Sequence, residues 1–173
     1  MNQEIRVQGI RFLILILVQV LILHQVNLGD EWLRFAEILI YPMFIMMMPM
    51  RWPSSLIILL AFLTGLIVDG FYDTPGVHAG ASTLSAFARP LVLQIIAPRA
   101  GYDPKQPLTK SMFGMAWYAS YAALFLLVHI FIVQLLTVFT FYYWTELLLR
   151  LALSWVLSLT LLILVDIIFN PKS

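Results

Sequence analysis

The sequence contains no cysteine and very few charged residues. Without cysteine, the chain cannot form disulfides, thiolate metal sites or iron–sulfur clusters, and it has no cysteine nucleophile. Charged residues make up 11% of its 173 residues, whereas a soluble domain has about 25%. A soluble domain of this length could not keep its surface hydrated with so few charges, so the sequence points away from the soluble classes.

Hydrophobic residues account for 62% of the chain and occur in long runs. An apolar run of about 18 residues or more indicates a helix that spans a membrane. We predict an all-α integral membrane protein, a single domain made of a bundle of six transmembrane helices. The predicted spans are 10–26, 32–50, 54–72, 77–97, 115–138 and 147–169.

The basic residues are unevenly distributed between the two ends of these predicted helices. With six spans, both termini lie on one side, and that side holds eight of the ten basic residues. The eight are Arg6, Arg11, Arg51, Arg89, Arg99, Lys105, Lys110 and Lys172. Since segments with an excess of Lys and Arg face the cytoplasm, we predict that both termini are cytoplasmic.

The second predicted span is unusual because it is rich in proline and methionine. Pro42 lies within it, so we expect the helix to bend or divide there. Residues 43–48 include four methionines, which adapt to irregular packing. We favour packing within the bundle or against lipid for this run, and the alternative is a face that binds a partner.

Small residues and carboxylates share one face of the third predicted span. Ala61, Gly65, Asp69 and Asp73 recur every four residues, so they lie on the same side of a helix. Small residues allow a second helix to approach closely. A carboxylate within a membrane usually faces the protein interior or water. We therefore expect this face to pack against the next span.

A polar stripe marks the fourth predicted span. His78, Ser82, Ser85 and Arg89 are spaced by four, three and four residues, which places them on one face of a helix. The stripe either lines a polar cavity for a ligand or partner helix, or consists of buried hydrogen bonds that hold the helices together. For His78 and Asp69, intramembrane ionisable residues, both interpretations remain open.

The depths of the charged residues suggest which of them form pairs. Asp69 and Arg89 are separated by roughly 13 Å along the membrane normal, too far for a direct contact. Asp166, near the inner end of the last span, matches the depth of Arg89. Our hypothesis is that Arg89 either pairs with Asp166 or extends to the inner surface.

The remaining polar residues of the spans indicate no chemistry of their own. We interpret them as contacts between helices. They are Gln19, His24, His129, Gln134, Arg150, Ser154 and Ser158. The sequence has no zinc-protease, nucleophile-elbow or phosphate-loop motif, so we predict neither an enzyme nor a metal or cofactor site. The few basic residues are scattered over loops, so we predict no binding of nucleic acid.

The turn between the third and fourth spans resembles the rod-shape-determining membrane protein MreD family. That family has Gly-x-x-x-Asp at the end of one span, a short turn, and Gly-Val/Leu-x-Ala at the start of the next. Gly65, Asp69, Gly76 and Ala79 occupy these positions. The chain length, the six-span pattern, the short loops and the cytoplasmic termini extend the resemblance over the whole chain.

The resemblance implies a non-enzymatic scaffold subunit of the bacterial cell-elongation (rod) complex, in the cytoplasmic (inner) membrane. Such a subunit helps to control cell shape and lateral peptidoglycan synthesis. The implied partners are an MreC-like protein with a single span, an MreB-like filament, RodA, penicillin-binding protein 2 and membrane lipids. The family also implies a fold similar to the substrate-binding subunits of energy-coupling-factor transporters. A vitamin-type transporter subunit is therefore the alternative function.

Overall fold

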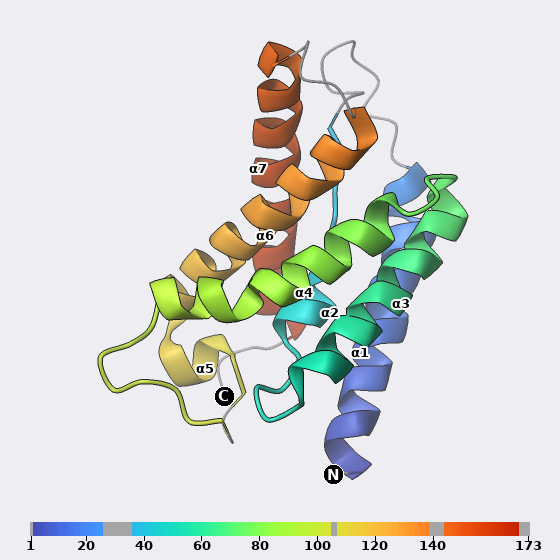
Figure 1. Ribbon diagram of the computed structural model, residues 1–173. Coiled ribbons are helices and arrows are strands. Elements are labelled where there is room, and N and C mark those ends of the chain that lie inside the picture. The colour runs from blue at the N-terminus through green and yellow to red at the C-terminus, as the bar shows by residue number, and fades with distance from the viewer. Residues whose placement is uncertain (1, 26–35, 105–106, 139–143, 170–173) are drawn as a thin grey trace.

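The computed structural model describes residues 2–25, 36–104, 107–138 and 144–169 (Figure 1). Within these ranges, all regular secondary structure is helical. The elements are α1 (Asn2–Leu21), the 3₁₀ helix η1 (Leu23–Gln25), α2 (Pro42–Met46), α3 (Ser54–Tyr72), α4 (Val77–Ile95), α5 (Lys110–Phe113), α6 (Met115–Val138) and α7 (Trp144–Phe169).

Four of the segments are long and apolar enough to cross a membrane, which indicates a membrane protein. They are Ile5–Gln25, Ser54–Tyr72, Met115–Thr137 and Thr145–Ile168, and they coincide with the first, third, fifth and sixth predicted spans. Helix α4 has the same length as α3, 19 residues. Its polar stripe makes it less apolar, so hydropathy alone does not mark it as a span.

The helices form a bundle in which successive segments alternate in direction (Figure 1). Helices α3 and α4 are antiparallel and meet closely at the turn that joins them. Helices α4 and α6 are inclined to α7. Helix α4 is also inclined to α3, so these two helices diverge with distance from their turn. The start of α1 and the end of α7 lie at the same end of the bundle.

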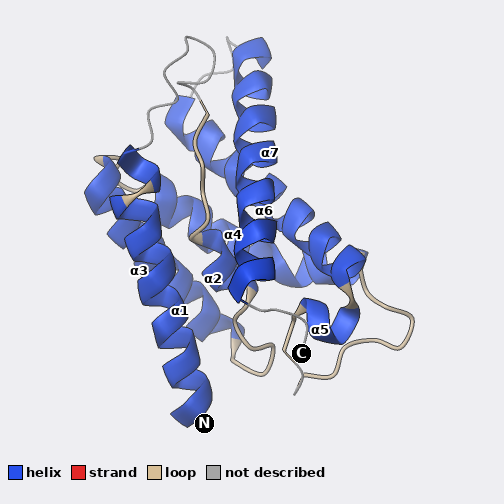
Figure 2. Ribbon diagram, turned by 180° about the vertical axis from the view of Figure 1, so that it is seen from behind, coloured by secondary structure: helices blue, strands red, loops and turns tan. Residues whose placement is uncertain are grey.

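The predicted span 32–50 is mostly non-helical in the described residues. Residues 32–35 lie outside the described residues, and residues 36–40 follow a nearly straight, non-helical path (Figure 2). Only Pro42–Met46 is helical, and Pro42 lies in its first turn. Proline has no N–H and cannot continue a helix that begins upstream, but it fits the first turn of a new one. The helix therefore begins at Pro42 rather than bending or dividing there, because the preceding residues 36–40 are not helical.

Residues 36–41, which we call the buried non-helical segment, run through the interior of the bundle. Leu39, Ile40 and Tyr41 are almost completely inaccessible to solvent. Hydrocarbon offers no hydrogen-bond partners, so a non-helical backbone at this depth must bond to other parts of the protein. The segment therefore depends on side chains that its neighbours supply.

Helices α7 and α1 bond to opposite sides of this segment. On one side, the N–H groups of Glu37 and Leu39 donate to the hydroxyl oxygens of Ser154 (2.9 Å) and Ser158 (2.8 Å) on α7. Residues 38 and 40 bond on the other side, to α1. This alternation has the period of two that is typical of a β-strand.

The side chain of Gln19 on α1 forms the second edge. Its amide nitrogen donates to the carbonyl of Ile38 at 3.0 Å, and its amide oxygen accepts from the N–H of Ile40 at 2.8 Å. The side-chain amide of Gln19 thus takes the place of the backbone N–H and carbonyl that a neighbouring β-strand would offer. We had interpreted Gln19, Ser154 and Ser158 as contacts between helices. All three bond to non-helical backbone, because these backbone groups have no other hydrogen-bond partners among the described residues. Gln19 also makes the expected contact between helices, since its amide nitrogen donates to the Tyr72 hydroxyl on α3 at 2.6 Å.

The serines on α7 allow a test of this dependence. Ser158→Ala is expected to lower the free energy of unfolding by about 1–3 kcal/mol, because the buried N–H of Leu39 would lose its acceptor. Ser120→Ala is the matched control, since Ser120 is exposed and bonds only to the Ala116 carbonyl of its own helix in the described structure. Denaturant unfolding of the protein in detergent micelles measures both changes. Equal losses for the two variants would contradict the bonding role of Ser158.

Candidate functional site

Asp69 lies near the end of α3, and its carboxylate is 3% exposed. One oxygen accepts hydrogen bonds from the N–H of His78 at 2.8 Å and from the hydroxyl of Thr74 at 3.1 Å. The other accepts from the N–H groups of Ala79 at 2.9 Å and Gly76 at 3.1 Å. Four donors therefore surround this single carboxylate.

These donors identify Asp69 as the cap of α4. The first N–H groups of a helix have no partner within the helix, and the helix dipole favours a negative charge beside them. The residue at the N-cap of α4 is Gly76, which has no side chain and adopts a left-handed φ of 87°. Asp69 reaches across from α3 and fills this role. Of the two interpretations left open for Asp69, the structure supports buried hydrogen bonds.

Gly65 allows the close approach of the two helices. A Cβ added at this position would lie 2.3 Å from the carbonyl oxygen of His78 and 2.6 Å from the Cα of Ala79. Only a residue without a side chain fits against the backbone of α4 here. Gly65, Asp69, Gly76 and Ala79, the four residues that resemble the MreD motif, thus build one helical hairpin.

A chain of buried side-chain hydrogen bonds lies next to this hairpin. The Ser85 hydroxyl donates to the Ala81 carbonyl at 2.7 Å, so its oxygen is left to accept from His129 Nδ1 at 3.0 Å. With its proton on Nδ1, a neutral His129 accepts the hydroxyl hydrogen of Tyr41 at Nε2, at 2.7 Å. The Tyr41 oxygen then accepts from His78 Nδ1 at 3.1 Å. One assignment of protons is consistent with every hydrogen bond in this chain.

The two ends of this chain determine what it can do. His78 Nε2 faces the carboxylate of Glu37 at 3.8 Å, which is too long for a hydrogen bond and suits an ion pair only when His78 is protonated. At the other end, the Ser85 proton is donated to a backbone carbonyl, which cannot pass a proton on. The chain therefore links α4, α6 and the buried non-helical segment rather than conducting protons.

Ser82, another member of the polar stripe, is fully buried and adjoins the Tyr41 hydroxyl. No group of three or more His, Asp or Glu side chains that could hold a metal ion occurs in the described part of the chain. His78, Ser82 and Ser85 thus take part in contacts between elements inside the bundle.

Arg89 bonds to the chain that follows α2. Its Nε donates to the hydroxyl of Tyr121 on α6 at 3.0 Å, and its Nη2 donates to the carbonyl of Met46 at 3.1 Å and to that of Met48. The Tyr121 hydroxyl in turn donates to the Met46 carbonyl at 3.1 Å. The guanidinium and the phenol therefore share the carbonyls at the end of α2.

The last carbonyls of a helix have no partners within it and favour a positive charge nearby. The carbonyl between the two that Arg89 binds, that of Met47, accepts from the side-chain amide of Gln8 on α1 at 3.0 Å. Three consecutive carbonyls thus receive donors from three different helices. Arg89 stabilises the end of α2 much as Asp69 stabilises the start of α4.

The structure shows neither alternative expected for Arg89, since it does not pair with Asp166 and, at 3% exposed, does not extend to the inner surface. The carboxylate of Asp166 lies 3.1 Å from Nζ of Lys110, which also donates to the Asp166 carbonyl at 2.7 Å. Lys110 is the first residue of α5, and these contacts place it beside the end of α7. Depth matched Arg89 to Asp166, but Arg89 turns toward the backbone carbonyls that follow α2 instead.

Sequence reasoning missed several residues of these networks, among them Tyr41, Tyr121 and Lys110. Tyr41 directly precedes Pro42, and the break expected at this proline was the available signal that its neighbour has a special environment. Tyr121 lies in an aromatic-rich apolar run, where nothing distinguishes it from a packing residue. Lys110 belongs to a basic loop in the sequence, and its burial depends on the fold.

The chain matches no family model, no curated protein and no solved structure at a significant level. The contacts of its own residues are therefore the basis for the functional argument.

The capping role of Asp69 predicts a large effect of removing its charge. Asp69→Asn is expected to lower the free energy of unfolding by about 3 kcal/mol or more, because charge-assisted hydrogen bonds contribute about 1.5–3 kcal/mol each. Asp73→Asn is the matched control, since Asp73 is exposed and asparagine tolerates its left-handed φ of 53°. Denaturant unfolding in detergent compares the two. A control that loses as much stability as Asp69→Asn would refute the cap.

The two glycines of α3 provide a second test. Gly65→Ala is expected to cost about 1–3 kcal/mol of stability, because the added methyl group collides with the backbone of α4. At Gly70 a Cβ would meet nothing within 4 Å. Gly70→Ala should therefore be neutral or stabilise by up to about 1 kcal/mol through helix propensity. Thermal unfolding in detergent measures both variants, and opposite signs are the expected result.

Proposed function

We propose that this chain is a non-enzymatic scaffold subunit of a bacterial cell-elongation complex, similar to MreD, that helps to control cell shape and lateral peptidoglycan synthesis. One observation carries the proposal: the residues that resemble the family motif build a helical hairpin and present no reactive group. The Asp69 carboxylate accepts hydrogen bonds from four donors of its own chain. This use of the motif supports a structural role.

The outward faces of the helices support the same proposal. Phe87, Leu91 and Ile95 recur every four residues along α4, and they are 74%, 60% and 68% exposed. A partner helix in the membrane can pack against such a face. The partners that fit the proposal are an MreC-like protein with a single span and, through it, an MreB-like filament, RodA and penicillin-binding protein 2.

The proposal includes a topology for the chain in the bacterial inner membrane. The chain crosses six times, both termini are cytoplasmic, and the fold is like that of the substrate-binding subunits of energy-coupling-factor transporters. In this topology, the second crossing consists of the buried non-helical segment, α2 and the turn before α3. The alternating directions of successive segments support this arrangement.

The alternative function is the substrate-binding subunit of a vitamin-type transporter. Glu37 and His78 favour it, because their side chains face each other at 3.8 Å and the side chain of Glu37 is 30% exposed. A solute with a polar head could bind to such a pair. The scaffold remains the better supported function, since Asp69 is already occupied by the hairpin.

Isolation of the tagged chain from its native membranes in mild detergent tests the proposal. The expected partner is a protein with one span and a large domain outside the cytoplasm, and depletion of the chain should turn rod-shaped cells round. Gly70→Ala should restore the rod shape in depleted cells, whereas Gly65→Ala should restore it poorly. Recovery of an ATPase pair with a coupling subunit, together with normal cell shape after depletion, would favour the transporter and sink the scaffold.

A further inference from the structure

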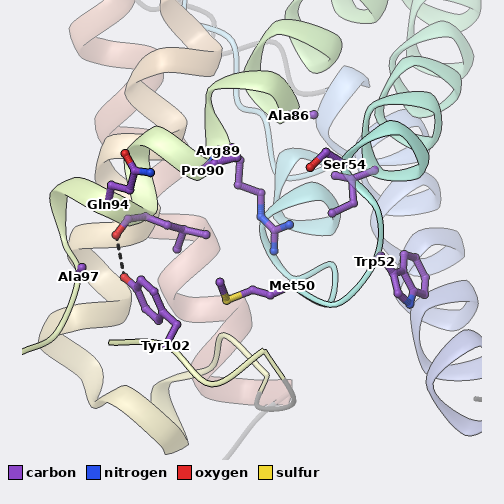
Figure 3. A pocket seen from close by; sticks show the side chains of 11 residues that line it. Met50, Trp52, Ser54, Ala86, Arg89, Pro90, Gln94, Ala97 and Tyr102 are labelled. Carbon is purple, nitrogen blue, oxygen red and sulfur yellow. Dashed lines mark hydrogen bonds between the residues drawn. The ribbon is translucent and has the colours of Figure 1, made fainter. Parts of the chain in front are cut away.

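A cavity of about 320 Å³ lies between the diverging ends of α3 and α4 (Figure 3). Its walls include apolar side chains from both helices, such as Ile57 and Leu93, and Met50 contributes from the turn before α3. Its polar lining residues are Ser54, Arg89, Gln94 and Tyr102. In Figure 3 the guanidinium of Arg89 extends into the space between Gln94 and Ser54.

Arg89 brings a buried positive charge to this cavity. The residue is 3% exposed, and a guanidinium stays protonated in proteins. Its hydrogen bonds go to the Tyr121 hydroxyl and to two backbone carbonyls, all uncharged acceptors. Within the described residues, no carboxylate pairs with Arg89, and its Nη1 makes no hydrogen bond. A buried charge without a counter-charge is costly, so the cavity favours a ligand that supplies a negative charge.

We propose that this cavity binds the phosphate group of an anionic membrane lipid. A guanidinium matches phosphate because two of its N–H groups can bond to two phosphate oxygens. The free Nη1 offers such donors, and Ser54 and Gln94 line the same cavity with a hydroxyl and an amide. The apolar walls suit the glycerol and the first methylene groups of a lipid better than a free ion.

The position of the cavity also favours a lipid. Trp52 lines it and is half-buried, as expected of a residue at a membrane–water interface. This end of the bundle holds the start of α1, the end of α7 and most of the basic residues. In the topology proposed above, on which this step rests, it is the end that faces the cytoplasmic leaflet, which is rich in anionic lipids. Basic pockets between helices on this side are suited to anionic headgroups.

Native mass spectrometry of the delipidated full chain, titrated with phosphatidylglycerol, with phosphatidylcholine or with inorganic phosphate, tests the proposal. We expect phosphatidylglycerol to bind about tenfold more tightly than phosphatidylcholine, a difference typical of one charge-assisted contact. Arg89→Gln should abolish this preference. Because Arg89 also bonds to the carbonyls at the end of α2, its replacement weakens the fold as well as the cavity, and a second variant is needed.

Ser54→Phe is that second variant, since it fills the cavity and leaves the carbonyl bonds of Arg89 intact. Ser55→Phe is its control, because Ser55 is equally exposed at the start of α3 but does not line the cavity. We expect Ser54→Phe to lose the preference for phosphatidylglycerol and Ser55→Phe to keep it. Equal binding of the two lipids by the native chain would overturn the proposal. Binding of inorganic phosphate that Ser54→Phe blocks, without any lipid preference, would also overturn it and assign the cavity to a free phosphate ion.

Discussion

A backbone that leaves helical geometry inside an apolar bundle must take its hydrogen bonds from side chains, because lipid supplies none. The segment between α1 and α3 imposes this constraint on the whole structure. Its N–H and carbonyl groups bond to Gln19 on α1 and to Ser154 and Ser158 on α7. The carbonyl of Met46, at the end of α2, accepts hydrogen bonds from Arg89 and Tyr121. These polar side chains thus lie beside the backbone groups that have no partner within a helix.

The hairpin of α3 and α4 follows the same physical rule at a helix end. The first N–H groups of α4 would remain unbonded in the interior, because Gly76 at the N-cap has no side chain. The carboxylate of Asp69 satisfies these groups and joins the two helices. Gly65 permits the short distance between the backbones that this contact requires. The absence of a side chain at Gly76 and the carboxylate of Asp69 therefore belong to one arrangement, in which Asp69 accepts the hydrogen bonds that the N-cap residue cannot.

These contacts bear on function because they show which polar groups are bonded within the protein and which remain able to bind another molecule. Asp69 and the chain of bonds from Ser85 to His78 are committed to other parts of the same protein. Such a centre holds the bundle in one shape, which suits a subunit that offers fixed surfaces to other membrane proteins. Arg89 differs, because its guanidinium is bonded on one side and faces a cavity on the other.

The sequence by itself determined the membrane class, the five long helices and the small-residue face of α3, since hydropathy and helical spacing are local properties. It also marked Pro42 as a break in helical geometry, because a proline acts on its own backbone. Only the tertiary structure decided which polar groups meet. Gln19 and Ser158 bond to the same segment from positions far apart in the chain, and Asp166 pairs with Lys110 rather than Arg89. Depth along a helix can be counted from the sequence, but the direction in which a side chain points depends on how the helices are inclined and on which backbone groups lack partners.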